Sequence, residues 1–318
     1  MKIVVTGAAG LIGSHLVDLL LEENHEVIAV DNLSFSEGSN LSIDVLEIDL
    51  AAQDAYKLIP DADIICHLAA YKKAPKNSIY SSNVMYVNFS MMHNVSKYCK
   101  ESKAKLLFTS TSDVYGNSNT FVENEPLLLG PPNVERYSYA LSKLHDEQFV
   151  LNMVSEKQIH ACIARIFGCA SPRSNKGWSG GHIPMFIDKA IKGEDINIHG
   201  DGLQTRSMSH ALDIAEGLSN MVSKLDILNG EIINIGTDEE TTVKECAEYI
   251  IKKTNSSSKI IYVDQTDAFG NYREIKRRWA NTSKAKLLIG YKVKYKTFEV
   301  IDEIIEVFKD EYSSFNPN

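Results

Sequence analysis

The chain opens with Met1-Lys2-Ile3-Val4-Val5-Thr6-Gly7-Ala8-Ala9-Gly10-Leu11-Ile12-Gly13, and this stretch decides the fold. A short strand-like run, Lys2–Thr6, leads into three glycines spaced three residues apart and then into a helix-like pattern. Glycine lets the backbone turn tightly and approach a pyrophosphate, while a helix N-terminus offers free N–H groups and partial positive charge. The stretch therefore predicts a dinucleotide-binding turn built on Gly7, Gly10 and Gly13.

Outward from this turn, short apolar runs alternate with helix-like stretches through the first half of the chain. Such alternation is typical of βαβ units, and continuously apolar strands are typical of a parallel sheet covered on both faces. We therefore expect an α/β fold with a Rossmann-type, doubly wound parallel sheet. The predicted strands are Lys2–Thr6, Glu26–Val30, Val45–Ile48, Ile64–Leu68, Lys105–Thr109 and Ala161–Ile166, and the predicted helices are Leu11–Glu23, Asn83–Ser102 and Tyr139–Glu156.

The character of the sequence changes from about Ser171, where a loop-rich stretch begins. We expect residues 1–170 to form the dinucleotide-binding domain and residues 171–318 a smaller C-terminal α/β substrate domain, with a strand or helix exchanged between the two lobes. The elements expected in the second half are helices Pro184–Lys192, Ala211–Lys224, Val243–Lys253 and Phe298–Tyr312 and strands Asp195–His199 and Glu231–Ile235.

The composition excludes several classes of partner. The net charge of −9 disfavours nucleic acid and anionic membranes, which attract basic surfaces. Five scattered cysteines without C-x-x-C spacing indicate reduced thiols in a cytoplasmic protein, and we expect no metal site. Met1 leads directly into the first strand, which leaves no room for a signal peptide, and no apolar run reaches the length of a membrane span.

Two carboxylates follow predicted strands on the path toward a bound dinucleotide. Asp31 ends the second strand, where a carboxylate can accept both ribose hydroxyls of adenosine and would repel a 2′-phosphate, so it favours NAD over NADP. Its alternative is an ordinary turn residue in Asp31-Asn32. Asp49 closes another strand and is either an adenine contact or a turn former.

Tyr139 and Lys143 form the predicted proton-transfer pair, because a spacing of four residues places them on one face of a helix. A neighbouring ammonium and a positive nicotinamide both favour phenolate and would bring the tyrosine pKa toward neutrality. Thr109–Gly116 follows a buried strand at the sheet edge where such folds place their sites. Its hydroxyls can bind a substrate alcohol, or the stretch is simply a Ser/Thr-rich turn.

Together these motifs resemble the extended short-chain dehydrogenases/reductases of the nucleotide-sugar epimerase/dehydratase family. The resemblance spans nearly the whole chain and includes Thr6–His15, Asp31–Ser34, His67–Ala70, Val87-Asn88, Ser110–Gly116, Tyr139-x-x-Ser142-Lys143, Ile198–Arg206 and Asn234–Gly236. It implies that Tyr139 takes a proton from a sugar hydroxyl, usually at C4, while NAD takes the hydride, and that Thr111 bonds the sugar oxygen.

The resemblance also assigns binding roles. NAD would contact Gly7, Gly10, Leu11, Ile12, Gly13, Asp31, Asn32, Ser34, Asp49, Leu50, Leu68, Ala69, Ala70, Asn88, Ser110, Tyr139 and Lys143. A UDP-sugar would contact Thr111, His182, Ile183, Ile198, Gln204, Arg206 and Arg273, with Arg206 on the diphosphate and His182-Ile183 with Ile198 beside the base. An arginine suits a diphosphate because its planar fork makes paired charge-assisted bonds.

The exact reaction depends on the residues after Thr111. Family 4,6-dehydratases typically have Thr-Asp-Glu and uronate decarboxylases Thr-Ser-Glu, where this chain has Thr111-Ser112-Asp113. Asp113 is either a general acid/base at C5 or a turn carboxylate. We expect net epimerisation of a UDP-hexose or UDP-N-acetylhexosamine at C4, or at C5 if Asp113 is a base. The alternatives are dehydration, uronate decarboxylation or, in another class, a non-catalytic NAD sensor.

Two long helices carry apolar stripes, Val84, Val87, Met91 and Val95 on one and Leu144, Phe149 and Met153 on the other. The stripes serve either core packing or an interface, which the spacing alone does not separate. The family resemblance implies a homodimer through a four-helix bundle built from these two helices.

Overall fold

Seven parallel strands form the central sheet of the computed structural model, which describes residues 1–34, 40–72, 81–177, 181–264 and 275–315. The strand order is β11-β6-β5-β4-β1-β2-β3, so the chain reverses its direction of travel across the sheet at β1. This doubly wound order confirms the predicted Rossmann-type fold. The strands are β1 Lys2–Thr6, β2 Glu26–Asp31, β3 Val45–Glu47, β4 Ile64–His67, β5 Lys105–Thr111, β6 Ala161–Ile166 and β11 Ile232–Ile235.

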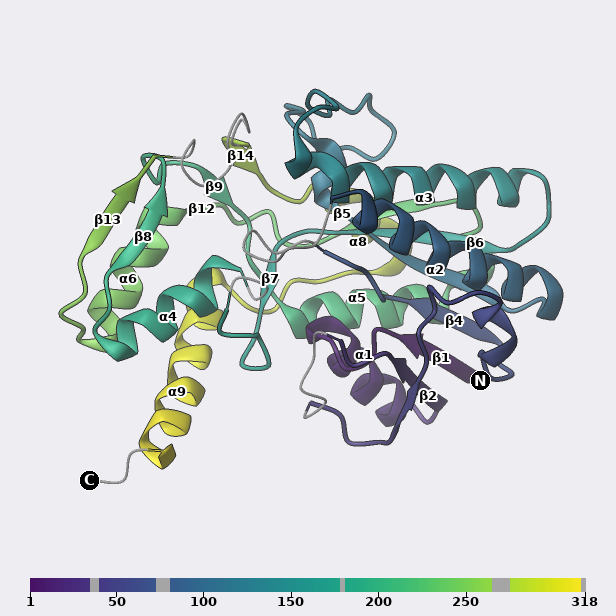
Figure 1. Ribbon diagram of the computed structural model, residues 1–318, viewed down its shortest axis with the longest axis horizontal. Helices are drawn as coiled ribbons and strands as arrows, with labels where there is room; N and C mark the ends of the chain where they lie inside the picture. The colour runs from purple at the N-terminus through teal and green to yellow at the C-terminus, as the bar shows by residue number, and fades with distance from the viewer. Residues whose placement is uncertain (35–39, 73–80, 178–180, 265–274, 316–318) are drawn as a thin grey trace.

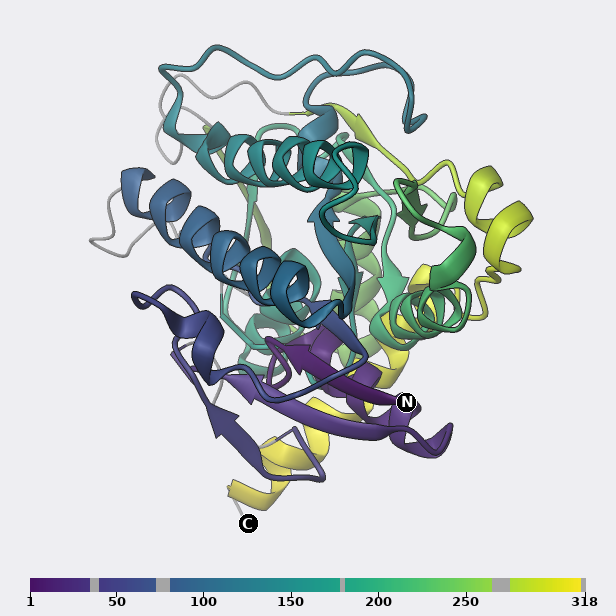
Figure 2. The ribbon, with the colours of Figure 1, turned by 90° about the vertical axis from the view of Figure 1, so that its right-hand side faces the viewer.

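Helices cover both faces of this sheet (Figures 1 and 2). The helices α1 (Leu11–Glu22) and α5 (Ala211–Ser223) lie on one face, and α2 (Ser81–Ser102) and α3 (Ser138–Ser155) lie on the other. Successive side chains of β1 point alternately into these two cores, with Ile3 and Val5 in the first and Val4 in the second. Burial on both faces explains why the strands read as continuous apolar runs.

The outermost strand comes from the second half of the chain. The strand β11 pairs in parallel with β6, and Ile232 lies opposite Ile163. The helix α5 packs against α1, far before it in sequence. Residues beyond 170 therefore complete the first sheet and one of its cores.

A second lobe lies beyond the carboxyl ends of the strands, at the left of Figure 1. It is built around the helices α4 (His182–Lys192), α6 (Val243–Thr254) and α9 (Thr297–Phe315), which bury a separate apolar core. Its strands form small sheets: β8 (Ile196–His199) with β13 (Ile260–Val263), and β9 (Thr205–Arg206) between β12 (Thr241–Thr242) and β14 (Arg277–Arg278). The strands β7 (Cys169–Ala170) and β10 (Ser209–His210) pair with each other next to α5. A further short helix, α8 (Ser283–Ile289), follows later in the chain.

The apolar stripe of α2 faces the sheet, since Val84, Met91 and Val95 are buried in the core. The opposite face of α2 carries Met85, Tyr86 and Phe89, which are exposed. Core packing is thus the role of the stripe, and any interface would use different residues. No helix among the described residues combines the length and apolar character that a membrane crossing would need.

Candidate active site

The glycine turn between β1 and α1 admits no side chain. Gly7 has a φ of +69°, and a Cβ at Gly7 would lie 2.6 Å from the backbone nitrogen of Ala69. A Cβ at Gly13 would lie 2.1 Å from the carbonyl oxygen of Gly7. Gly10 is the N-cap of α1, so Leu11 and Ile12 form the first turn, whose N–H groups are free to bind an anion. The turn fits the pyrophosphate of a dinucleotide.

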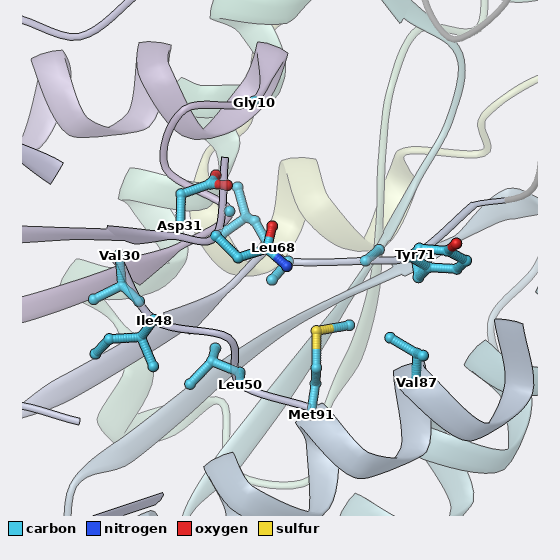
Figure 3. Close-up of a pocket in the computed structure, with 13 residues that line it drawn as sticks. Gly10, Val30, Asp31, Ile48, Leu50, Leu68, Tyr71, Val87 and Met91 are labelled. Atoms are coloured by element: carbon cyan, nitrogen blue, oxygen red, sulfur yellow. The ribbon is translucent and has the colours of Figure 1, made fainter. Parts of the chain in front are cut away.

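A cavity opens beside this turn at the carboxyl ends of β1, β2 and β4 (Figure 3). Its walls are apolar except at Asp31, Asn32 and Tyr71. In Figure 3, Asp31 lies beside the glycine turn, while Val87 and Met91 reach in from α2. The lining residues are Gly7, Gly10, Val30, Asp31, Asn32, Ile48, Leu50, Leu68, Ala69, Ala70, Tyr71, Val87 and Met91.

Asp31 fixes the turn at one end of the cavity. Its Oδ2 accepts a hydrogen bond from the Ala9 N–H at 3.1 Å and its Oδ1 one from the Leu33 N–H at 2.9 Å. Asn32 lies beside it in the lining, and its Oδ1 accepts from the N–H of Ser34, whose side chain is exposed. A carboxylate held at this place suits the ribose hydroxyls of adenosine.

Asp49 does not line the cavity. Its side chain is exposed, and its Oδ1 accepts a hydrogen bond from the Ala51 N–H at 3.0 Å. This is the geometry of a turn former, the alternative that the sequence left open. The neighbouring Ile48 and Leu50 supply the wall instead, because alternate residues at the strand end point inward.

Asn88 fixes the backbone of one cavity wall through its side-chain amide. Its amide makes a two-way bond with the backbone of Tyr71, accepting from the N–H at 2.7 Å and donating to the carbonyl at 3.1 Å. The same Nδ2 group donates to the Ser142 hydroxyl on α3 at 2.9 Å. Asn88 therefore joins the segment Leu68–Tyr71, which lines the cavity, to the helix that carries Tyr139.

His67 is a buried neutral side chain at the end of β4. Its Nδ1 lies 2.8 Å from the Thr6 hydroxyl, and its ring stacks on Phe108. Burial lowers the pKa of His67 to about 3, and the charge of Lys143 adds to the decrease. The imidazole therefore stays uncharged at neutral pH.

Tyr139 and Lys143 lie on one face of α3, as the spacing predicts. The Lys143 ammonium is buried, donates to the Thr109 carbonyl at 3.0 Å and lies 4.6 Å from the centre of the Phe108 ring. Burial lowers the pKa of Lys143 to about 8. Burial raises the pKa of Tyr139 well above its usual value, and Asp113 and Asp146 raise it further. The expected decrease in the tyrosine pKa is therefore not produced by this chain's own residues, because burial and two carboxylates all raise it.

Thr111, Ser110 and Asp113 lie at the end of β5, beside Tyr139. The Thr111 hydroxyl accepts from the Asp113 N–H at 3.2 Å and caps the short 3-10 helix η2 (Ser112–Tyr115). Within the described residues, the buried Ser110 hydroxyl has no hydrogen-bond partner, so it can bond a ligand. Asp113 forms an ion pair with Arg278 of β14, in the second lobe.

The predicted substrate residues of the second lobe have different environments. Ile183 and Ile198 are 0% and 1% exposed and lie in the lobe's core. Burial lowers the pKa of His182 to about 4, and the charge of Arg206 acts in the same direction. Arg206 donates to the carbonyls of Thr205 and Ile275, each at 2.8 Å, and Gln204 donates to the His199 carbonyl at 3.1 Å. Arg273 lies outside the described residues.

Leu50, Leu68, Ala69 and Ala70 were predicted and line the cavity, whereas Arg278 and the rest of the apolar wall were not predicted from the sequence. Arg278 follows Arg277 in a two-residue strand that carries no periodic pattern, so only the fold could place it beside Asp113. Val87 and Met91 belong to the predicted stripe of α2, but the pattern did not show that its N-terminal end reaches the cavity. No group of three or more metal-ligating side chains gathers anywhere in the described part of the chain.

Comparisons with known proteins agree with this geometry. Residues 3–236 match the model of the family described as the NAD dependent epimerase/dehydratase family. A UDP-N-acetyl-alpha-D-glucosaminuronate decarboxylase of Bacillus cytotoxicus is 31% identical over 317 residues, which cover 97% of this chain and 98% of that protein. The UDP-glucuronic acid decarboxylase 3 of Arabidopsis thaliana is 32% identical over 321 residues, covering 97% of this chain and 89% of that protein.

A similar fold is found in a solved UDP-glucuronic acid 4-epimerase from Bacillus cereus, crystallised with UDP-4-deoxy-4-fluoro-glucuronic acid and NAD. The TM-score is 0.82 and the identity 27%, and the match covers 98% of this chain and 100% of that one.

Proposed function

The chain belongs to the NAD-dependent epimerase/dehydratase family, and we propose that it oxidises a UDP-uronate at C4 and then releases its carboxylate as carbon dioxide. It is an enzyme, and its cofactor is NAD. From the sequence alone, epimerisation is the expected reaction and decarboxylation an alternative. Two relatives at 31% and 32% identity are named as uronate decarboxylases, and they support placing decarboxylation ahead of epimerisation.

The residues around Tyr139 suit the first half of this reaction. The glycine turn and Asp31 would hold NAD, which accepts a hydride from the sugar and later returns it. Tyr139 takes the proton of the C4 hydroxyl, and Thr111 orients that oxygen from the end of β5. Lys143 supplies the positive charge that favours the phenolate.

The observation that carries the second half is the ion pair between Asp113 and Arg278, beside Tyr139. Once C4 is a ketone, the carboxylate on C5 is β to a carbonyl. The bond from C5 to the carboxylate carbon breaks, its electron pair moves toward the C4 oxygen as an enolate, and C5 takes up a proton. Arg278 is placed to stabilise the enolate charge, and Asp113 is placed to direct the proton.

Epimerisation at C4 is the second candidate, supported by the 27% identity to the UDP-glucuronic acid 4-epimerase. It uses the same oxidation but requires the carboxylate to stay on the sugar until the hydride returns to the opposite face. The substrate class would be the same, and only the fate of the carboxylate differs. Nothing in the structure favours the non-catalytic sensor, because Tyr139 and Lys143 are both present.

The experiment is incubation with UDP-glucuronate and with UDP-N-acetylglucosaminuronate in deuterated water, followed by proton NMR and mass spectrometry. Carbon dioxide loss with deuterium at C5 is the expected result. A C4 epimer with an intact carboxylate would select the second candidate. Oxidation of UDP-glucose with no reaction of either uronate would contradict the proposed substrate class.

We also propose that the protein is a cytoplasmic homodimer that pairs through α2 and α3. The exposed Tyr86 and Phe89 on α2 support this, and Phe89 packs edge-on against His145 and Phe149 of α3. Exposed aromatic side chains gathered on neighbouring helices are typical of interfaces. Light scattering after size-exclusion chromatography should give twice the chain mass, and Tyr86→Glu with Phe89→Glu should give the monomer mass.

A further inference from the structure

Four charged side chains are buried where α3 meets β5 and β6. Lys143 and Glu147 are each 2% exposed, Asp146 is 1% exposed and Arg165 is 3% exposed. A buried charge is costly unless an opposite charge or strong hydrogen bonds compensate for it. Each of these four residues therefore requires an explanation, and the mechanism above uses only Lys143.

Glu147 and Arg165 compensate each other. The Arg165 guanidinium donates from Nε to one carboxylate oxygen of Glu147 at 3.0 Å and from Nη2 to the other at 2.7 Å. This two-pronged pair is neutral as a unit. It leaves Lys143 as the buried cation and Asp146 as the buried anion on the same stretch of helix.

Asp146 lies on the helix face that carries the redox pair. It follows Lys143 by three residues and Tyr139 by seven, and both spacings return to the same side of an α-helix. Its hydrogen-bond partner is Nδ1 of the exposed His145, at 3.4 Å. Such a long contact compensates poorly for the burial of a carboxylate, so the stability of the helix does not explain why an acid is placed here.

We infer that Asp146 is a positioning residue of the redox site, whose carboxylate keeps the buried Lys143 in its ammonium form beside Tyr139. The inference rests on the redox half of the proposed function, the pairing of Tyr139 with Lys143. It is independent of which sugar is bound and of what happens to the carboxylate of that sugar.

At Lys143 the electrostatics have the required sign, whereas the same carboxylate acts on Tyr139 in the opposite sense by raising its pKa. Burial lowers the pKa of Lys143 to about 8, and Asp146 and Glu147 oppose that decrease. Burial raises the pKa of Asp146, and the Lys143 charge opposes the increase. Because Glu147 is already paired with Arg165, Asp146 is the carboxylate whose charge is available to Lys143.

The other charged or titratable groups around Lys143 do not replace this carboxylate. His67 on β4 is neutral, and Asp113 beside η2 is paired with Arg278. Tyr139 itself carries no negative charge until it loses its proton. On α2, His93 lies against the ring of Phe149, farther along α3. Removal of the Asp146 charge should therefore lower the pKa of Lys143 into the neutral range.

The test measures the pKa of Lys143 directly. Protein labelled with ¹³C at the lysine ε-carbons is titrated by NMR between about pH 6 and pH 10, and the Lys143 signal is assigned by its loss in Lys143→Arg. In Asp146→Asn the pKa of Lys143 should fall by roughly one unit, a tenfold change in its protonation equilibrium. Asp146→Glu should restore most of the shift, and Asp146→Ser serves as a second neutral variant if the first does not fold.

Glu156→Gln is the matched control, because it removes an exposed carboxylate at the end of the same helix. It should leave the Lys143 titration unchanged. A Lys143 pKa that is equal in the wild type and in a folded neutral variant would overturn the inference. The titration needs no substrate, so this outcome is separable from a failure of the proposed function.

Activity provides the second readout. If kcat for sugar oxidation follows the ammonium form of Lys143, it should fall roughly twofold at pH 7 and roughly tenfold at pH 9 in Asp146→Asn, while KM for the sugar stays within twofold. The loss should shrink further as the pH is lowered. A purely structural role would lower the melting temperature and leave the pH dependence of kcat unchanged.

Discussion

The glycine turn and the Asp113–Arg278 pair are both parts of the proposed active site, but the chain builds them in opposite ways. The turn is made from residues 7–13, which are contiguous. The contacts that require glycine are with backbone atoms, those of the turn itself at Gly13 and those of Leu68 and Ala69 after β4 at Gly7. The pair joins residues 165 positions apart, one at the end of β5 and the other on a two-residue strand of the second lobe. Under the proposed function we therefore expect cofactor binding to depend on the first lobe alone, whereas the fate of the sugar should depend on how the two lobes meet.

The largest expected effect separates the redox step from cofactor binding. Tyr139→Phe removes the hydroxyl that takes the sugar proton, so oxidation should slow roughly 10³-fold, within the range of general acid–base catalysis. NADH absorbance in a single turnover measures this step. NAD affinity, measured by calorimetry, should not change, because the cavity beside the glycine turn does not include Tyr139. Retained oxidation would show that the first lobe uses another base.

The second effect tests whether cofactor binding is local. In Gly13→Ala the added Cβ would lie 2.1 Å from the Gly7 carbonyl oxygen, and neither backbone segment can yield without moving the turn. NAD affinity should fall roughly 100-fold, or about 3 kcal/mol.

Gly290→Ala is the control for this change. Gly290 also has a positive φ, +69°, but no atom lies within 4 Å of the Cβ position and the residue is far from the cavity. It should cost about 1 kcal/mol of stability and leave NAD affinity unchanged. Equal loss of affinity in the two variants would mean that general destabilisation, not the turn, governs cofactor binding.

The third effect breaks the contact between the lobes. Arg278→Gln leaves the Asp113 carboxylate without its cation and removes the charge placed to stabilise an enolate, so carbon dioxide release should fall roughly 30-fold, or about 2 kcal/mol. Oxidation at C4 should change by less than threefold. The neighbouring Arg277→Gln is the matched control, because Arg277 is exposed and pairs with Glu240. If both variants lose the same activity, the pair with Asp113 has no specific role.

The same contrast explains how far the sequence could be read. The glycine turn, Asp31, Tyr139 and Lys143 were predictable because each lies within one strand–turn–helix unit or on one helix face, where spacing fixes geometry. The sheet and its flanking helices followed from apolar periodicity in the same way. Asp49 could not be separated from its neighbours, because one residue more or less at a strand end decides which side chain faces the cavity.

Arg278 and the true environment of Tyr139 were beyond the reach of spacing. Arg278 is placed by pairing of β14 with β9, and its strand is too short to have a pattern. The pKa of the Tyr139 phenol is raised mainly by burial and further by Asp113 and Asp146, which the spacing of the motif does not reveal. Long-range strand pairing and the desolvation of side chains are properties of the folded chain, and neither can be predicted from a local run of residues.

The smallest expected effect is on the pH dependence of folding stability, through the buried His67. Unfolded histidine takes up a proton near its ordinary pKa of 6.5, whereas folded His67 has a pKa of about 3. Between these values the unfolded state binds more protons, so the stability from neutral His67 is complete above pH 6.5 and is lost as the pH falls. The loss should be about 1 kcal/mol for the first unit below 6.5, where the unfolded histidine is only half protonated at the start.

Urea unfolding at pH 7.5, 6.5 and 5.5 measures this loss, with His67→Gln beside the wild type. The difference at pH 7.5 gives the packing cost of the substitution, which has no pH dependence. Between pH 6.5 and pH 5.5 the variant should lose about 1 kcal/mol less than the wild type. His67 ends β4 beside Thr6, next to the glycine turn. An equal loss of stability in both proteins would mean that the acid sensitivity lies elsewhere. One such place is His15, which bonds Ser171 where the lobes meet. The stability of the region around His67 would then not depend on acid, and the junction between the lobes would be the part of the molecule that acid destabilises first.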